Sequence, residues 1–298
     1  ANRPGNFVIS ENEIQSNVDA IVVSGSSLEG EIMANQIYAR HNGITFATLD
    51  LEMNEPGLIA NNFVLLGDSA NYAVYLEGDN SFGVYYNTIY STEDAAANYG
   101  IGLGVSVRQG VEIINNVIAH KFNGAPLYFQ DTAAIEQLDY NCYYTPGVSI
   151  LAAPEKVFNL SELRKYLGMD QHSLNAYPVF QGDSNLHALT PWFDGNGTPI
   201  TAITTDIDGQ SRSGLAPDIG ADEYTPYATH TNAYSGAYTV GSGGNFSSLG
   251  EAIDSLKIRG LGADVSLEFL SGTYTVNAAL PAFSGMGAEA QLTLTSQT

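Results

Sequence analysis

Carboxylates are the side chains best suited to chemistry in this sequence, and five of them lie between residues 206 and 223. Asp206, Asp208 and Asp218 lie in stretches rich in Gly and Pro, with Asp222 and Glu223 close by. Carboxylate oxygens in turns are ligands that Ca²⁺ prefers, although the spacing differs from an EF-hand loop. Two interpretations stay open: a calcium site at Asp206, Asp208 and Asp218, or carboxylates that cap turns. No other cofactor is predicted.

Two further motifs are interpreted structurally. Cys142 is the single cysteine, so it forms no internal disulfide and matches no metal-binding spacing. A small packed residue in a strand is the favoured interpretation. The glycine-rich stretch 241–244 precedes a helical pattern, but it lacks the Lys-Ser/Thr pair of a phosphate-binding loop. We interpret it as a turn.

The elements that position these residues follow from a repeat centred on asparagine. The template is apolar-x-x-Asn-x-apolar, each interval also holds a second strand-like run, and successive asparagines are 25 to 29 residues apart. Such a period predicts a solenoid whose coils pair through parallel strands, with the asparagine amides bonded along the axis as a ladder. The ladder residues are Asn6, which begins a truncated copy, and Asn35, Asn62, Asn87, Asn116 and Asn141.

This repeat resembles the right-handed parallel β-helix superfamily, which includes pectate lyases, polygalacturonases and many non-enzymatic surface proteins. The resemblance covers residues 1–150 and implies an all-β solenoid. Polygalacturonases carry Asp-Asp, Gly-His-Gly and Arg-x-Lys motifs, which this sequence lacks. Lyases of this fold need a basic residue, for which Arg108, His120 and Lys121 are the candidates within the coils. The repeat places no carboxylate beside His120, so a partly buried histidine is favoured and no catalytic residue is predicted.

The remaining chain breaks the period. Residues 151–225 are similar to the capping segment that closes many secreted β-helices, and they contain a short helix with Ser161 as N-cap and Gly168 as C-terminal stop. Residues 226–235 are interpreted as a linker. Residues 236–298 contain a strand, a glycine-rich turn, an amphipathic helix and further strands, and they resemble the N-terminal entry of a second β-helix module. We expect a tandem array.

The outer face of the ladder strand is unusually apolar. Side chains one and three residues after each ladder asparagine should point outward, and they include Tyr38, Tyr90 and Tyr144. Such a face is either covered by the capping segment or is a contact surface for glycans or a protein partner. Coverage is favoured.

The charge composition argues against some classes of partner. Lys and Arg number 10 against 32 Asp and Glu, a formal charge of −22, which argues against nucleic acid and anionic membranes as partners. We expect no membrane insertion and an extracellular or bacterial cell-surface location, by resemblance to large repetitive proteins exported by the type IX route. The leading hypothesis is a structural or adhesive, non-catalytic module, with other modules of the same long chain, glycans or surface proteins as partners. The alternatives are a polysaccharide lyase or hydrolase, and a glycan-binding module.

Overall fold

The chain forms two units, and each is described by itself. The first consists of Ala1–Asn175, Gly182–Leu186 and Phe193–Tyr224, and the second of Ala176–Gln181, His187–Trp192 and Thr225–Thr298. Two short stretches of the expected capping segment therefore group with the second unit. The computed structural model describes residues 7–25, 30–48, 57–67, 71–78, 81–92, 98–104, 110–146, 149–153, 156–226, 232–274, 280, 283–285 and 290–296.

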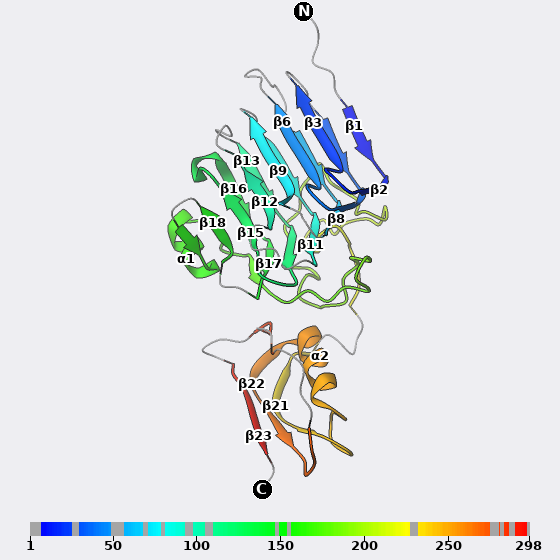
Figure 1. Ribbon diagram of the computed structural model, residues 1–298, viewed down its shortest axis with the longest axis vertical. Coiled ribbons are helices and arrows are strands. Elements are labelled where there is room, and N and C mark those ends of the chain that lie inside the picture. Colours follow the sequence, from blue (N-terminus) through cyan, green and yellow to red (C-terminus); the bar gives the residue numbers. More distant parts are fainter. Residues whose placement is uncertain are drawn as a thin grey trace, which may run out of the picture. The chain divides into compact units, whose positions relative to one another are not determined.

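The first unit is a parallel β-solenoid of six coils, which confirms the predicted all-β fold (Figure 1). Each coil contains three strands, one more than the sequence suggested, because a sharp turn divides the asparagine template into two strands. The first sheet holds β1(Phe7–Ser10), β4(Gly30–Met33), β7(Gly57–Ala60), β10(Phe82–Tyr85), β13(Val111–Ile114) and β16(Ile135–Asp139). The second holds β2(Glu13–Ser16), β5(Gln36–Ala39), β8(Phe63–Leu66), β11(Thr88–Ser91), β14(Val117–His120), β17(Cys142–Tyr144) and β20(Leu174–Asn175). The third holds β3(Ile21–Gly25), β6(Ile44–Thr48), β9(Tyr72–Gly78), β12(Tyr99–Leu103), β15(Ala125–Phe129), β18(Leu151–Ala153) and β19(Lys156–Phe158).

The turn between the first and second strands has the same backbone conformation in every coil. The residue before each ladder asparagine adopts a left-handed conformation, with φ between 53° and 61°. A single left-handed residue turns the chain sharply, so both flanking strands can face the same interior. This conformation disfavours most side chains, yet only two of the six residues are Asn. They are Glu11, Ala34, Asn61, Tyr86, Asn115 and Tyr140.

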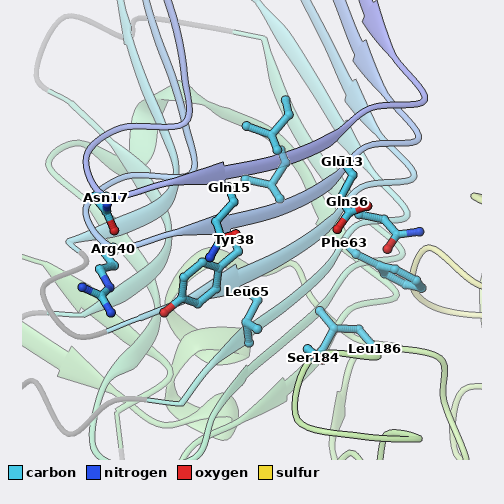
Figure 2. Close-up of a pocket in the computed structure, with 12 residues that line it drawn as sticks. Glu13, Gln15, Asn17, Gln36, Tyr38, Arg40, Phe63, Leu65, Ser184 and Leu186 are labelled. Carbon is cyan, nitrogen blue, oxygen red and sulfur yellow. The ribbon is translucent and has the colours of Figure 1, made fainter.

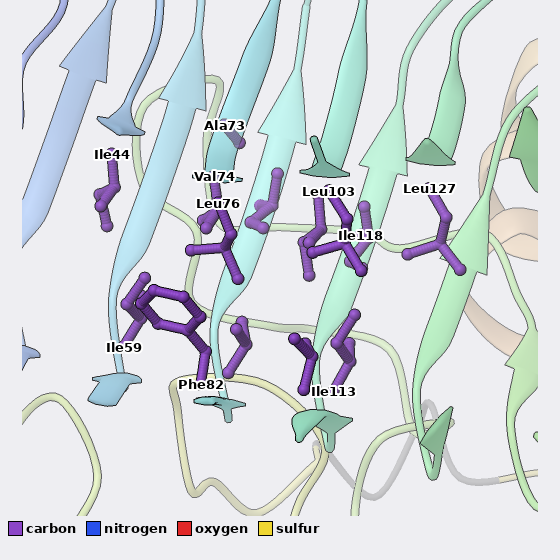
Figure 3. Close-up of a cluster of buried hydrophobic side chains, with 14 of the residues drawn as sticks. Ile44, Ile59, Ala73, Val74, Leu76, Phe82, Leu103, Ile113, Ile118 and Leu127 are labelled. Atoms are coloured by element: carbon purple, nitrogen blue, oxygen red, sulfur yellow. The ribbon is translucent and has the colours of Figure 1, made fainter. Parts of the chain in front are cut away.

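Aliphatic side chains from all three sheets fill the solenoid. Equivalent positions stack from coil to coil, as the register Ile32–Ile59 and Val84–Ile113 shows. Figure 3 shows such rows side by side, and Ile59, Val74 and Leu127 in them are fully buried. Stacking of like residues gives a continuous dry interior, which stabilises coils that could not bury an apolar face alone.

A short helix closes the last coil. Helix α1(Leu160–Leu167) follows β19, which pairs antiparallel with β18 and so ends the parallel series. Leu160 and Leu163 belong to the solenoid core. The N-cap is Asn159, rather than the expected Ser161, because Asn159 and Glu162 form a capping box. The expected stop at Gly168 is correct, with φ of 69°.

The second unit has its own core and a three-stranded parallel sheet. Its strands are β21(Tyr234–Val240), β22(Leu261–Phe269) and β23(Leu292–Ser296), and helix α2(Leu249–Arg259) connects the first two. Ser248 caps the helix, whose Ala252, Ile253 and Leu256 are buried. The strand–helix–strand order is the one that the sequence indicated.

Candidate binding groove on the second sheet

The asparagines of the repeat are hydrogen-bonded side chain to side chain along the solenoid. The Nδ2 of each donates to the Oδ1 of the next, from Asn35 to Asn62 (3.0 Å), onward through Asn87 and Asn116 (2.9 and 3.0 Å), and to Asn141 (3.0 Å). Each Nδ2 also donates to two backbone carbonyls, as at Asn87. These amides cross-link the coils inside the protein, where they are fully buried.

Asn12, and not Asn6, occupies the ladder position of the first coil. Its Nδ2 donates to Asn35 Oδ1 at 3.0 Å, whereas Asn6 lies outside the described residues. The sequence Ile9-x-x-Asn12-x-Ile14 fits the template in full. The identification of Asn6 was wrong because it relied on a spacing close to the other intervals, and this first coil is shorter.

Ser173 ends the ladder after Asn141, the asparagine of the last coil. Its Oγ accepts the backbone N–H of Asn141 at 2.8 Å and donates to the carboxyl group of Asp170. Asp170 is also buried beside the hydroxyl of Tyr143. Burial raises the pKa of Asp170 to about 7, against the opposing effect of the hydrogen bonds from Ser173 and Tyr143.

The capping segment covers the outer face of the second sheet over the later coils. The backbone N–H of Ala221 donates to Thr88 Oγ1 at 2.9 Å, and Gly220 lies so close to Thr88 and Val117 that a Cβ would meet both. Tyr144 is only 3% exposed, so it offers no surface for a glycan. Tyr90 is half-buried. Tyr38, the first of the three tyrosines named from the sequence, lines a hollow.

That hollow is a groove of about 390 Å³ over the first three coils of the second sheet (Figure 2). Its floor is formed by Phe63, Leu65 and the ring of Tyr38, and Leu186 lies on one side. Ile14 and Ile37 add to the apolar lining, and the polar lining residues are Glu13, Gln15, Asn17, Gln36, Arg40 and Ser184. An apolar floor with polar groups around it suits a ligand that is both flat and rich in hydroxyl groups.

Gly67 leaves room for the ring of Tyr38. A Cβ on Gly67 would lie 2.7 Å from Tyr38 Oη and 3.5 Å from Arg40 Cγ. The position of the Tyr38 ring therefore depends on the glycine of the next coil, whereas a Cβ would only contact Arg40. Figure 2 shows the Tyr38 hydroxyl on the same side of the groove as Arg40 and Asn17, while Glu13 and Gln36 lie at the opposite end. The charged groups of Arg40 and Glu13 therefore lie at opposite ends of the groove.

Two of the three carboxylates expected to bind calcium, those of Asp206 and Asp218, accept backbone N–H groups in turns. Asp206 Oδ1 accepts the backbone N–H groups of Asp208 and Gln210, at 3.0 and 2.7 Å, and Oδ2 accepts that of Glu223. Asp218 accepts the N–H of Gly195 and of Tyr224, each at 2.7 Å. Burial raises the pKa of Asp218 to about 7. These bonds are the ones that turn-capping carboxylates make, so at Asp206 and Asp218 they favour that interpretation.

The basic candidates do not form a reaction centre in the described part of the chain. His120 is fully buried, neither ring nitrogen has a hydrogen-bond partner there, and burial lowers its pKa to about 4. Its register partner in the preceding coil is Ser91, as the repeat predicted. Lys121 lies over the ring of Phe122. Arg108 lies outside the described residues.

Sequence reasoning missed the contacts that hold the capping segment in place. Arg212 lies 3.9 Å above the ring of Tyr86, donates to Asn61 Oδ1 at 2.8 Å and pairs with Glu223. Asn115 exchanges two hydrogen bonds with the backbone of Thr198. The left-handed turn residues of three neighbouring coils, Asn61, Tyr86 and Asn115, therefore bind the capping segment. In the sequence, the only sign of this shared role is that each directly precedes a ladder asparagine.

Comparison with known protein families, with curated proteins and with solved structures finds no match to this chain. Among the described residues, no helix combines the length and the apolar character needed to cross a lipid bilayer.

Proposed function

We propose that this solenoid is a non-catalytic adhesive module of an extracellular protein and that it binds a glycan in the groove over Tyr38. The observation that carries the proposal is the lining of the groove: aromatic and aliphatic side chains form the floor, and amide, guanidinium and carboxylate groups surround it. Sugar rings have apolar C–H faces that pack on aromatic rings and hydroxyl groups that bond to such polar groups.

A binding role suits the groove better than hydrolysis. Glycoside hydrolysis ordinarily uses two carboxyl groups on either side of the scissile bond. Among the described residues that line the groove, Glu13 supplies one carboxylate, and Arg40 is a cation that stays protonated. The rigid stack of coils holds these groups in fixed positions, which lowers the entropic cost of binding.

Binding and product release should be measured on a panel of neutral and acidic polysaccharides, with and without Ca²⁺. We expect binding without product, weakened about tenfold or more by Tyr38→Ala. Gly67→Ala should also weaken it, because the new Cβ displaces the Tyr38 ring. Tyr166→Ala is the matched control, since Tyr166 is 51% exposed on α1, outside the groove. Equal affinities for Tyr38→Ala and wild type would refute a role of the groove in glycan binding. Released product would establish an enzyme instead.

A further inference from the structure

Four tyrosines from three successive coils form a cluster on the outer face of the third sheet. Tyr75 and Tyr128 alternate along their strands with core residues, so their rings point away from the interior. Tyr72 and Tyr99 are the first residues of β9 and β12. All four side chains are half-buried. The three strands that carry this tyrosine cluster each pair with a strand on both sides, and the groove lies on a different sheet.

The rings of the tyrosine cluster contact one another within and between coils. The ring centroids of Tyr99 and Tyr128 are 4.7 Å apart, and the ring planes meet at 38°. Tyr72 and Tyr75, both on β9, are also 4.7 Å apart. The rings of Tyr72 and Tyr99 stack at 5.3 Å with an angle of 24°. This spacing follows from the fold, because paired strands of neighbouring coils run about 4.8 Å apart.

Two glycines of the central coil make room for this packing. Gly102 is the register partner of both Tyr75 and Tyr128. A Cβ on Gly102 would lie 2.4 Å from Cδ1 and Cε1 of Tyr72, so any side chain there would displace that ring. A Cβ on Gly104 would lie 2.7 Å from Tyr75 Oη. The tyrosine cluster therefore depends on residues that leave space for the rings.

The arrangement suits a reaction between rings better than the binding of a ligand. A sugar or a cation binds to the open face of an aromatic ring, whereas here Tyr72 and Tyr99 stack on each other. One-electron oxidation of a phenol gives a radical that couples through the ring carbons next to the oxygen. Two phenols held in contact couple with each other far more readily than two phenols that must meet by diffusion.

We propose that the tyrosine cluster is an oxidative cross-linking site, at which the rings of Tyr99 and Tyr128 are joined as dityrosine. The oxidant is hydrogen peroxide, used by a peroxidase. Each phenol loses the hydrogen of its hydroxyl group, and the two phenoxyl radicals form a bond between one Cε carbon of each ring. The hydrogens on these carbons then move to the oxygens, which restores both phenols. The protein loses two hydrogen atoms in total, and the peroxide becomes two molecules of water.

This pair is chosen because its bond would link two coils. Tyr99 belongs to the fourth coil and Tyr128 to the fifth, so the bond closes a loop over residues 99–128. A bond between Tyr72 and Tyr75 would lie within β9 and would link no coils. A covalent link across a loop restricts the unfolded chain and so stabilises the folded one, as a disulfide does.

The test is to treat the full chain with a peroxidase and hydrogen peroxide. Dityrosine is followed by its fluorescence, and the linked residues are identified by mass spectrometry of tryptic peptides. We expect a link between the peptides 41–108 and 122–156, with a mass lower by two hydrogens than their sum. The chain should remain a monomer on a denaturing gel. Its Tm should rise by a few degrees.

Tyr128→Phe keeps the ring and removes the phenol, so this link should disappear. Tyr166→Phe is the matched control: Tyr166 is 51% exposed on α1, and its loss should leave the yield unchanged. Circular dichroism spectra like that of the wild type would show that both variants fold. Dityrosine formed mainly between chains, or a yield unaffected by Tyr128→Phe, would overturn the proposal. So would a chain that forms no dityrosine under conditions in which free tyrosine couples.

Discussion

The side chain of Asn87 takes part in five hydrogen bonds. Its Nδ2 donates to Ile59 O, Tyr85 O and Asn116 Oδ1, and its Oδ1 accepts from the backbone and the amide of Asn62. All five bonds are made in a fully buried site. Buried polar groups that lose their partners are costly. The ladder asparagine is therefore a point of high sensitivity in each coil.

We expect Asn87→Ala to lower the free energy of unfolding by about 3 kcal/mol or more, because the Asn62 amide and two carbonyls lose their partner inside the protein. Urea unfolding measures the change. Asn12→Ala is the control: its side chain is exposed and donates to Ser10 O and Asn35 Oδ1, so its loss should cost about 1 kcal/mol or less. Similar losses for both variants would argue against a special role of burial.

His120 should make the protein less stable in acid. Burial lowers its pKa from 6.5 to about 4, so the unfolded chain binds a proton between these pH values that the folded chain does not. Stability from this residue is therefore present above pH 6.5 and is lost as the pH falls towards 4. We expect His120→Phe to gain about 2 kcal/mol or more relative to wild type between pH 7 and pH 4.

The comparison is made by urea unfolding at several pH values. Asp170 and Asp218 have the opposite effect on stability as the pH falls. Burial raises the pKa of each to about 7, so the folded chain takes up these protons before the unfolded chain does and is stabilised by them. The difference between variant and wild type isolates His120 from these groups. His172→Phe is the control, because the His172 side chain is 60% exposed. Parallel stability curves for wild type and His120→Phe would contradict the expectation.

At the scale of elements, the capping segment depends on Arg212. Its side chain is 2% exposed and joins Glu223, Asn61 and the ring of Tyr86. The left-handed turns of neighbouring coils thus have a second role beyond bending the chain, since their side chains form the surface on which this segment lies. Ile203 adds an apolar contact with Ala60 and Tyr86.

We expect Arg212→Ala to destabilise the protein by about 3 kcal/mol, because it leaves Glu223 without its partner. Protease cleavage within residues 199–216 should increase. Arg212→Lys should rescue this only in part, since an ammonium cannot replace the planar guanidinium. Arg259→Ala is the matched control: Arg259 lies 3.8 Å above the Tyr234 ring in the second unit. Cleavage that is unchanged in Arg212→Ala would show that other contacts hold the segment.

Elements set by local pattern could be predicted, and those set by distant contacts could not. The asparagine template indicated the solenoid and five ladder residues, and the pattern around Gly168 indicated where α1 ends. The strand-dividing turn was missed because Ala34 and Tyr86 are not residues that typically adopt positive φ. Arg212 meets Asn61 across 151 residues, a separation at which no periodicity in the sequence links them.

The groove likewise combines a residue that the repeat indicated with others that only distant contacts place there. Tyr38 was found because its position after Asn35 repeats in each coil. Its surroundings were missed, since Gly67 shapes the ring's position from the next coil and Leu186 comes from a segment without a repeat. Coverage of this face was the favoured interpretation, and Tyr144 agrees with it. The pattern that Tyr144 shares with Tyr38 and Tyr90 could not indicate which of the three is covered.

At the scale of the molecule, the formal charge of −22 should make stability depend on salt. Repulsion among exposed carboxylates is screened as the Debye length falls from about 30 Å at 0.01 M to about 8 Å at 0.15 M. We therefore expect Tm to rise by a few degrees over this range in NaCl, measured by calorimetry. Choline chloride should act equally if screening is the cause. A Tm that falls with salt would show that attractive ion pairs outweigh repulsion.

The same experiment tests calcium. CaCl₂ at matched ionic strength should raise Tm no further if Asp206 and Asp218 serve only to cap turns. An additional rise at low millimolar CaCl₂, lost in Asp208→Asn, would support the metal interpretation instead.

The stacking of coils along one axis also has a mechanical consequence. Strand hydrogen bonds run along the solenoid axis, so a pull on the chain at the first coil loads the edge of one coil at a time. The ladder amide of each coil must break before the next coil is loaded. Under tension we expect the protein to lengthen in steps, each releasing one coil of about 25 residues, or about 80–90 Å of extended chain. A solenoid built this way would yield gradually under tension while the end covered by α1 stayed folded.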